Sequence, residues 1–364
     1  MGIMSNINVT KTFLPPQEEF QKYLDRIWEN SQLTNQGPLL LELENKLREF
    51  LGVENLHVVS NGTMALQLAL RALDITEGEI ITTPFSYVAT ASSILWEHCS
   101  PVFVDIEPDS FSIDASKIEA AITQRTKAIL PVHVFGLPCN TERIDQIAQS
   151  RNLRLVYDGA HAFGAHYKDR SLLDYGDIST GSFHATKLFH TIEGGCLIVK
   201  DKLVSEKIEL LKRFGHNGDE HYTLGINAKA SEFQAAMGLC NLKYLNSNIE
   251  ARKKITELYD SLLQGVIVRP KLSNNLRYNY PYYPVVFENE TQLLRILNSL
   301  NKINIFPRRY FYPSLNTLPY LNQTQSCPVS EDIASRILCL PLYPTLETEN
   351  VHSISEVIKH EANH

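Results

Sequence analysis

Residues 56–73, LHVVSNGTMALQLALRAL, have the pattern of a strand, a polar turn and a helix in direct succession. The run from Leu56 to Ser60 is short and β-rich, and the turn Asn61-Gly62-Thr63 separates it from the helical run 64–73. A strand that enters a helix through such a turn brings free backbone N–H groups and the positive end of the helix dipole to one point. That point suits a phosphate group, although turns of this kind also serve only as connections.

The alternation of strand and helix continues along the chain. We expect strands at 79–83, 101–105, 128–132, 154–158 and 196–199, and helices at 16–28, 39–51, 87–96, 116–122, 141–151 and 203–214. Short β-rich runs separated by helices indicate βαβ units, and hence a mainly parallel sheet with helices on both faces. The sequence therefore predicts an α/β fold whose ligands bind at the carboxyl ends of the strands.

The pattern changes after residue 200. A loop rich in Gly, His and Asn is expected at 215–227, and the later elements are two long helices (231–245 and 249–263), a strand (280–287) and two further helices (291–300 and 331–338). A chain of 364 residues exceeds the size of most single cores. We therefore predict a large domain at 1–245, which includes the N-terminal helical segment, and a smaller α+β domain at 246–364.

Composition excludes several functional classes. The net charge of -7 argues against a general nucleic-acid binder, which usually carries a basic excess. The first residues lack the pattern of a signal peptide, and no apolar run reaches the length of a membrane span, so we expect a cytoplasmic protein without a membrane partner. The six cysteines are scattered, so we expect reduced, mostly buried thiols and no metal site.

A second stretch, TGSFHATKLFHTIEGGCLIVK at 180–200, has Lys187 at its centre. A lysine whose pKa is lowered by its surroundings can form a Schiff base with a carbonyl group. Asp158 ends a predicted strand, as does the turn 61–63, so both should lie at the ligand-binding edge of the sheet. A pyridoxal phosphate site needs these three groups: donors for the phosphate, a carboxylate for the pyridine nitrogen and a lysine for the aldehyde. Phe85 or Tyr87 could supply an aromatic face for the ring.

Several spaced runs together resemble the DegT/DnrJ/EryC1/StrS sugar aminotransferases. The matching runs are GSFHATK at 181–187, EGG at 193–195, NGTMAL at 61–66, YVAT at 87–90, FVDI at 103–106, PVHVFG at 131–136, DGAH at 158–161 and LPLY at 340–343. The resemblance covers the chain from about Pro15 to Tyr343, and it implies the aspartate aminotransferase-like fold (fold type I) with pyridoxal 5'-phosphate as cofactor.

The resemblance also implies roles for individual residues. Lys187 would be both the covalent anchor of the cofactor and the proton carrier, and Asp158 would pair with the pyridine nitrogen. The remaining cofactor-binding residues would be Gly62, Thr63 and Ser182 at the phosphate, Tyr87 on the ring, His161 near the phenolic oxygen, and Asn227, which would reach the phosphate in a neighbouring subunit. The protein would then be a homodimer with shared active sites.

Within the family, the sequence looks most like enzymes that transfer an amino group from glutamate to C4 of dTDP-4-keto-6-deoxyglucose. The product, dTDP-4-amino-4,6-dideoxyglucose, is used in O-antigen or related glycans. Arg308, Arg309 and Tyr310 are candidates for binding the nucleotide-linked sugar, although a solvated arginine pair is as good an interpretation. The chain departs from the family pattern at three positions, Asn61, Gly159 and Ile192.

Alternatives remain open at this level. Amination at C3 of an isomeric keto-sugar is the near competitor, and glutamine could replace glutamate as the donor. A non-catalytic pyridoxal phosphate-binding regulator would need the same site, but the chain has no basic patch or appended DNA-binding segment. A nicotinamide-dependent oxidoreductase is disfavoured because no GxGxxG run follows a strand.

Overall fold

The computed structural model describes residues 6–321 and 325–362. The helices are α1 (Gln17–Asn30), α2 (Pro38–Leu51), α3 (Gly62–Ala72), α4 (Ala89–Trp96), α5 (Ala115–Ile118), α6 (Thr141–Arg151), α7 (Lys202–Leu211), α8 (Glu232–Leu262), α9 (Glu290–Lys302), α10 (Pro328–Arg336) and α11 (Thr348–Ala362). No helix in this part of the chain combines the length and apolar character that a bilayer crossing demands.

The strands form one large sheet and several small ones. They are β1 (Ile7–Asn8), β2 (Asn55–Val59), β3 (Gly78–Thr82), β4 (Cys99–Phe103), β5 (Thr126–Leu130), β6 (Arg154–Asp158), β7 (His166–Tyr167), β8 (Arg170–Ser171), β9 (Ile178–Ser182), β10 (Gly195–Val199), β11 (His216–Asn217), β12 (Glu220–His221), β13 (Leu276–Arg277), β14 (Tyr283–Val286), β15 (Ile305–Phe306) and β16 (Ile337–Leu340). The large sheet has seven strands in the order β2-β10-β9-β6-β5-β3-β4.

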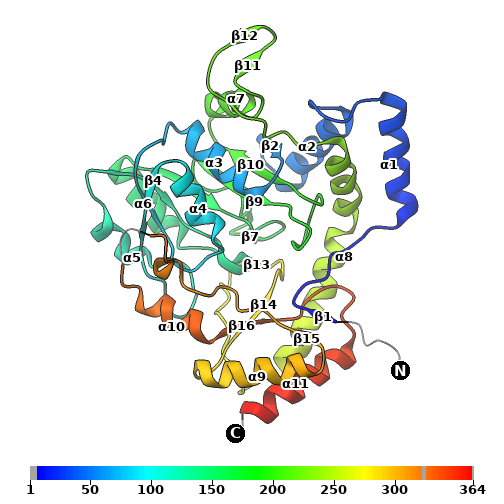
Figure 1. The fold of residues 1–364 in the computed structure, drawn as a ribbon, viewed down its shortest axis with the longest axis vertical. Coiled ribbons are helices and arrows are strands. Elements are labelled where there is room, and N and C mark those ends of the chain that lie inside the picture. The colour runs from blue at the N-terminus through cyan, green and yellow to red at the C-terminus, as the bar shows by residue number, and fades with distance from the viewer. Residues whose placement is uncertain (1–5, 322–324, 363–364) are drawn as a thin grey trace.

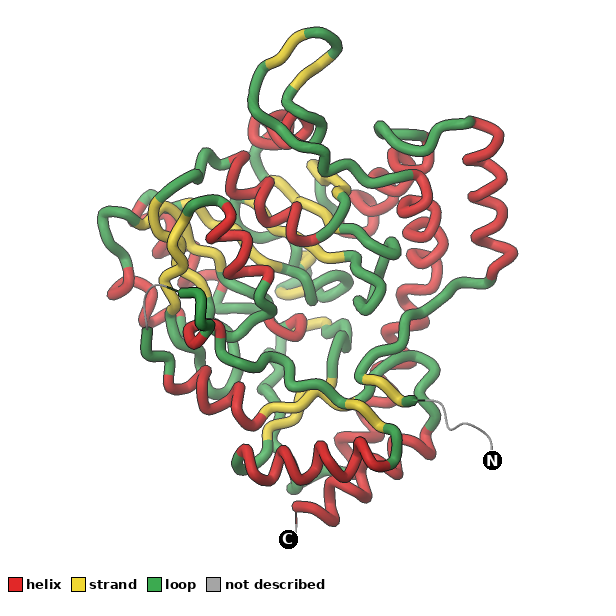
Figure 2. Tube along the Cα trace, viewed as in Figure 1, coloured by secondary structure: helices red, strands yellow, loops and turns green. Residues whose placement is uncertain are grey.

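This sheet is mainly parallel, as the sequence predicts. Only β10 runs against its neighbours, β2 and β9, and the other adjacent pairs are parallel. Side chains of α3 and α7 pack on one face of the sheet, and those of α2, α6 and α8 pack on the other. Figures 1 and 2 show the resulting three layers. The carboxyl ends of β2, β3, β5, β6 and β9 therefore share one edge, where the polar turns of the chain gather.

The C-terminal part has its own apolar core. The antiparallel pair β14 and β16 packs with α9, α11 and the second half of α8. The N-terminal strand β1 joins this part, because it pairs with β15 in parallel. The α+β character of this region agrees with the sequence, and the division at residue 245 stays a prediction.

Three element predictions are corrected by the structure. The helices expected at 231–245 and 249–263 are one continuous helix, α8, because Leu245 and Asn248 are buried and their packing outweighs the weak helix propensity of Asn and Ser. The expected strand at 280–287 shortens to β14, since Tyr280 has a positive φ of 52°. The helix expected at 331–338 begins earlier and gives way to the buried strand β16.

Candidate active site

A cavity of about 290 Å³ opens at the carboxyl edge of the large sheet. It is lined by residues from the ends of several strands and by three aromatic residues of the C-terminal part. The predicted site residues that line it are Gly62, Thr63, Tyr87, Asp158, His161, Ser182, Lys187 and Tyr310. The fold thus brings together segments that are spread over about 250 positions of the sequence, because parallel strands end at a common edge.

Asp158 is the last residue of β6 and is buried. Its Oδ2 accepts a hydrogen bond from the hydroxyl of Thr90 (2.8 Å), and its Oδ1 accepts one from the backbone N–H of Ala160 (3.1 Å). Burial raises the pKa of Asp158, while these two hydrogen bonds and the charge of Lys187 act in the opposite direction. A cation placed against this carboxylate would lower its pKa and stabilise its negative charge, so the site favours a positively charged ligand group.

Lys187 lies on the loop that follows β9 and is partly buried. Burial lowers its pKa to about 8, although the negative charge of Asp158 works against this shift. Its amine donates a hydrogen bond of 3.5 Å to the hydroxyl oxygen of Tyr282. A lysine with this pKa has about one-tenth of its amine in the free, nucleophilic form near pH 7, far more than an ordinary lysine.

The opposite end of the cavity is the N-terminus of α3. The helix begins at Gly62, and the side chain of Asn61 caps it by accepting a hydrogen bond from Met64 N–H (2.9 Å). A Cβ at Gly62 would lie 2.9 Å from the Cβ of Ser182, so a larger residue would fill this part of the cavity. Free N–H groups of Gly62 and Thr63 and the Ser182 hydroxyl therefore form a cradle suited to an anion.

His161 packs beside two aromatic rings, Phe135 and Phe311, which also contact each other. The backbone N–H of Phe135 donates to its Nδ1 (3.1 Å), which leaves the proton of the neutral ring on Nε2. Its ring is parallel to those of Phe135 and Phe311, with interplanar angles of 6° and 5°. Burial, and secondarily the charge of Lys187, lowers its pKa well below the usual value, so His161 is neutral.

The two aromatic candidates for stacking differ in position. Phe85 is fully buried and packs edge-on against Phe111, Phe135 and Phe311, so it belongs to the core. Tyr87 lines the cavity and is 61% exposed, so its ring is open to a ligand.

The predicted sugar-binding residues also differ in whether they lie at the cavity. Tyr310 lines the cavity, and the exposed Arg308 has its guanidinium 5.9 Å from the Tyr310 ring. The guanidinium of Arg309 is occupied elsewhere, since it donates to Glu290 (2.7 Å) and to the carbonyl of Ser335 (2.6 Å). This arrangement gives the substrate-binding prediction for Arg309 no support, because its Nη2 group binds outside the cavity and Arg309 is not among the residues that line it.

Asn227 does not line this cavity. It is exposed, and it bridges to Arg213 at the base of the loop that carries β11 and β12. This loop projects from the molecule at the top of Figure 1.

Sequence reasoning assigned no role to Thr90, Tyr282 and Phe311, which the structure places in the site. Thr90 ends the run YVAT at 87–90. Its hydroxyl oxygen is 2.9 Å from that of Ser86, which lies four residues earlier. The four-residue spacing of these two hydroxyl side chains is a signal by which the sequence could have pointed to Thr90. Tyr282 and Phe311 come from the C-terminal part, and nothing in their local sequence directs them to the cavity.

Two of the departures noted in the sequence, Gly159 and Ile192, lie where the backbone is closely constrained. A Cβ at Gly159 would lie 2.3 Å from Leu173 Cδ2 and 2.8 Å from the carbonyl oxygen of Thr180, so glycine fits closely here. Ile192 has a φ of 71°, in the left-handed region that favours glycine, and its side chain is 45% exposed.

Other sequence expectations concern cysteine and metal chemistry. All six cysteines are buried and free, which confirms the prediction of unpaired thiols. Within residues 6–321 and 325–362, no cluster of three or more His, Cys, Asp or Glu residues is arranged to hold a metal.

Comparison with known proteins agrees with this geometry. The chain is 44% identical over 363 residues to a dTDP-4-amino-4,6-dideoxy-D-glucose transaminase of Shigella dysenteriae, and the match covers 97% of this chain and 98% of that protein. Among solved structures, DesI in the presence of its TDP-sugar product matches with a TM-score of 0.94 and 29% identity, covering 99% of this chain and 94% of DesI. The PLP-form of the sugar aminotransferase Spr1654 from Streptococcus pneumoniae, described as putative, matches with a TM-score of 0.91 and 27% identity, covering 99% of both chains.

The family model that matches residues 16–359 describes the DegT/DnrJ/EryC1/StrS aminotransferase family. The match extends over both the large sheet and the C-terminal part, and it includes every residue that lines the cavity. The chain therefore belongs to the DegT/DnrJ/EryC1/StrS aminotransferase family.

Proposed function

We propose that this protein is a pyridoxal phosphate-dependent aminotransferase that transfers an amino group from glutamate to C4 of dTDP-4-keto-6-deoxyglucose, which gives dTDP-4-amino-4,6-dideoxyglucose. The observation that carries the reaction class is one cavity that holds the carboxylate of Asp158, the amine of Lys187 and the N-terminus of α3. The choice of sugar is supported by the relative from Shigella dysenteriae, which matches 97% of this chain. Use of the product in O-antigen or lipopolysaccharide assembly, and the cytoplasmic location, stay predictions.

The lining residues fit pyridoxal phosphate at each of its polar groups. Its phosphate would be held by the cradle of Gly62, Thr63 and Ser182, which a side chain at position 62 would fill. Its ring nitrogen would be held by the buried carboxylate of Asp158, whose preference for a cation matches a protonated pyridine. The open ring of Tyr87 offers a stacking face, and the Nε2 proton of His161 offers a donor for the phenolic oxygen.

Pyridoxal phosphate, when bound, supplies an aldehyde that carries the amino group and a cationic ring that stabilises negative charge at the adjacent carbon. The chain supplies the proton transfers. Lys187 Nζ, whose lowered pKa favours the free amine, takes the proton from Cα of glutamate in the first half-reaction and delivers a proton to C4 of the sugar in the second. Asp158 keeps a proton on the ring nitrogen throughout, and the hydrogen bond from Thr90 helps to keep Asp158 ionised.

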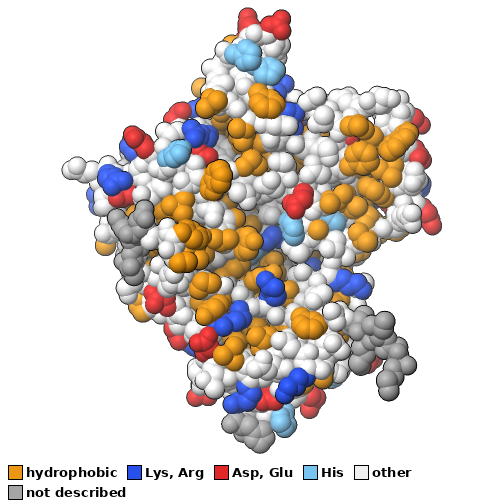
Figure 3. Space-filling view, viewed as in Figure 1, with side chains coloured by type: hydrophobic (Ala, Val, Ile, Leu, Met, Phe, Trp, Pro, Cys, Tyr) orange, Lys and Arg blue, Asp and Glu red, His pale blue; other side chains and the backbone are white. Residues whose placement is uncertain are grey.

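A homodimer with shared sites is part of the proposal. Asn227 is exposed and outside the cavity of its own chain, as expected for a residue that acts in a neighbouring subunit. The projecting loop around it exposes large apolar side chains, which favours cover by a second copy. These side chains are Phe214 (51% exposed), Tyr222 (59%), Leu224 (84%) and Ile226 (42%). Figure 3 shows hydrophobic side chains on the loop at the top and across the middle of the same face.

The first test is loading with the cofactor. The purified protein should be yellow after reconstitution with pyridoxal phosphate, and borohydride should bleach the colour and attach the cofactor to Lys187, which peptide mass spectrometry can locate. Lys187→Ala should not be labelled, whereas Lys200→Ala, an exposed control at the end of the same stretch, should be labelled normally. Absence of bound cofactor in the wild-type protein would contradict the proposal.

The second test identifies the substrate. The protein is incubated with glutamate or glutamine and with a panel of nucleotide-linked keto-sugars, and NMR of the product places the new amine. We expect an amine at C4 of the dTDP sugar with 2-oxoglutarate as co-product. An amine at C3 would favour the competing assignment, and a protein that binds the cofactor but aminates no sugar would favour a regulator.

A further inference from the structure

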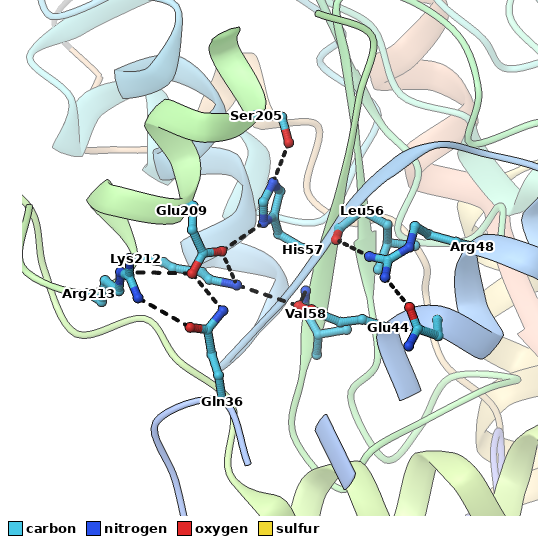
Figure 4. Close-up of polar contacts among 11 residues, drawn as sticks. Gln36, Glu44, Arg48, Leu56, His57, Val58, Ser205, Glu209, Lys212 and Arg213 are labelled. Atoms are coloured by element: carbon cyan, nitrogen blue, oxygen red, sulfur yellow. Dashed lines mark hydrogen bonds and ion pairs between the residues drawn. The ribbon is translucent and has the colours of Figure 1, made fainter. Parts of the chain in front are cut away.

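A buried cluster of charged residues lies outside the cavity, on the outer side of strand β2 (Figure 4). Lys212, which follows α7, has only 1% of its side chain exposed. Its Nζ is 2.9 Å from Glu209 Oε2 and 3.5 Å from Glu44 Oε1. Glu209 Oε2 is also 3.3 Å from Nδ1 of His57, a residue of β2. We call Glu44, His57, Glu209 and Lys212 the Lys212 cluster.

The charges of the cluster depend on one another. Burial acts to raise the pKa of Glu209, but the hydrogen bond with His57 and the charge of Lys212 outweigh it and hold the pKa at about 2. A buried ammonium is tolerated only when carboxylates surround it, and removing the ammonium leaves carboxylates without a partner. Lys212 is therefore the residue on which the arrangement of the other three depends.

One connection runs from the cluster to strand β2 through a side chain. The Oε1 atom of Glu44 accepts a hydrogen bond from the backbone N–H of Val58 (2.9 Å). The same oxygen accepts a second, longer one from Nζ of Lys212. Strand β2 is at the edge of the large sheet, so this N–H has no strand partner and the carboxylate satisfies it. Val58 lies four residues before Gly62, at the start of the anion cradle.

A second connection runs through the backbone. The carbonyl of Lys212 accepts a hydrogen bond from Ala228 N–H (3.0 Å), and the carbonyl of Ala228 accepts one from Ser60 N–H (2.8 Å). The projecting loop, residues 213–227, is the segment of the chain between Lys212 and Ala228. Gln36 adds a further tie at the base of this loop, because its amide binds both Glu209 (2.6 Å) and Arg213 (3.3 Å).

The first connection reaches Val58 and the second reaches Ser60, which directly precedes the Asn61 cap of α3. We propose that Lys212 is a positioning residue that fixes the base of the projecting loop relative to the cradle at Asn61–Thr63. A conformational change in either segment therefore alters the other. Lys212 does not line the cavity, and it acts through Glu44 and the Ala228–Ser60 hydrogen bonds. The cofactor readout below rests on the proposed function, and the exchange readout does not.

The test compares Lys212→Met with Lys212→Arg in the full-length protein. Lys212→Met keeps the length of the side chain and removes its charge, Lys212→Arg keeps the charge, and Lys202→Met removes an exposed lysine from the start of the same helix. Amide hydrogen exchange is measured by mass spectrometry, and the affinity for pyridoxal phosphate is measured by absorbance titration of the cofactor-free protein, both well below the melting temperature.

For Lys212→Met we expect exchange at 58–63 and 213–229 to accelerate by about tenfold or more, with α9 unchanged. The dissociation constant for pyridoxal phosphate should rise by about tenfold, and Lys212→Arg should recover most of both effects. Lys202→Met should match the wild type. A folded Lys212→Met protein with wild-type exchange and affinity overturns the proposal, and so does faster exchange spread evenly over the chain, which would mean that Lys212 serves stability alone.

Glu209→Gln provides a second variant if Lys212→Met does not fold, since Glu209 is only partly buried. It should accelerate exchange in the same two segments, and unchanged exchange there would overturn the proposal. A wild-type protein that binds no pyridoxal phosphate would refute the proposed function, while the exchange pattern would still decide the role of Lys212.

Discussion

Lys187 Nζ lies 3.5 Å from the hydroxyl oxygen of Tyr282, although the two residues are 95 positions apart. Tyr282 directly precedes β14 in the C-terminal part, and Lys187 follows β9 of the large sheet. Burial raises the pKa of Tyr282, so its hydroxyl stays protonated and its oxygen accepts from the lysine. This contact joins the two parts of the chain at the amine that carries the proposed chemistry.

Replacing Tyr282 with Phe should lower kcat by roughly threefold to tenfold, because a single hydrogen bond contributes about 0.5–1.5 kcal/mol. The loss of an acceptor for the ammonium form should also lower the pKa of Lys187, so the acidic limb of the kcat profile should move to lower pH. Steady-state kinetics across pH measure both effects. Tyr280→Phe is the control, since Tyr280 packs on Tyr278 and does not line the cavity. If kcat and its pH profile are unchanged in Tyr282→Phe, the hydrogen bond between Lys187 and Tyr282 has no role in catalysis.

The reactivity of Lys187 should rise through pH 8. With its pKa at about 8, the fraction of free amine increases from about one-tenth near pH 7 to about nine-tenths near pH 9. Capture of pyridoxal phosphate by the cofactor-free protein should accelerate by a similar factor, which stopped-flow absorbance can follow. A capture rate that does not change between these pH values would contradict the lowered pKa.

The same shift affects stability. The folded-state pKa of Lys187 lies below its ordinary value of 10.5, so between about pH 8 and 10.5 the unfolded chain binds more protons than the folded chain. The contribution of this group to the free energy of unfolding therefore rises with pH across that window. Urea unfolding of the cofactor-free wild type and of Lys187→Met should show this rise in the wild type alone.

Thr90→Val should weaken catalysis through Asp158. Thr90 donates to Asp158 Oδ2 at 2.8 Å, and this hydrogen bond opposes the rise in pKa that burial causes. Its loss should raise the pKa of Asp158 further and reduce kcat/KM by about tenfold, most strongly on the acidic side. Ser93→Ala is the matched control on α4, because Ser93 donates only to the carbonyl of Thr90. An equal loss of kcat/KM in the two variants would show that disturbance of α4, and not a change in the pKa of Asp158, causes the loss.

Ile192→Gly should stabilise the protein. Ile192 has a φ of 71°, where a residue with a Cβ is strained by about 1–2 kcal/mol, and its exposed side chain contributes little burial. After the entropic cost of glycine in the unfolded chain, a net gain of about 1 kcal/mol remains. Ile303→Gly is the control, because Ile303 is similarly exposed but has a φ of -107°, and this change should destabilise. Denaturant midpoints of the two variants that move in the same direction would contradict the strain at Ile192.

Much of the fold follows from local pattern. Helix α6 and strand β6 occupy the residues that periodicity predicts, because their apolar spacing and flanking turn residues are strong local signals. The break expected near Asn246 does not occur, since buried contacts along α8 override weak propensity there. Strand β9 has a polar sequence, Ile-Ser-Thr-Gly-Ser, and only its place between β10 and β6 inside the sheet explains why it is a strand.

The sequence by itself determined the strand–turn–helix at 56–73 and the position of Asp158 at the end of a buried strand, whereas the strand that precedes Lys187 depends on the sheet around it. Parallel strands end at one edge, so these groups had to lie close together. Only the tertiary structure decided that Tyr282 meets Lys187, that Arg309 turns away to Glu290, and that Lys212 is buried between two carboxylates. The physical reason is that such contacts join segments distant in the chain, and they depend on how the whole core packs, which no local periodicity encodes.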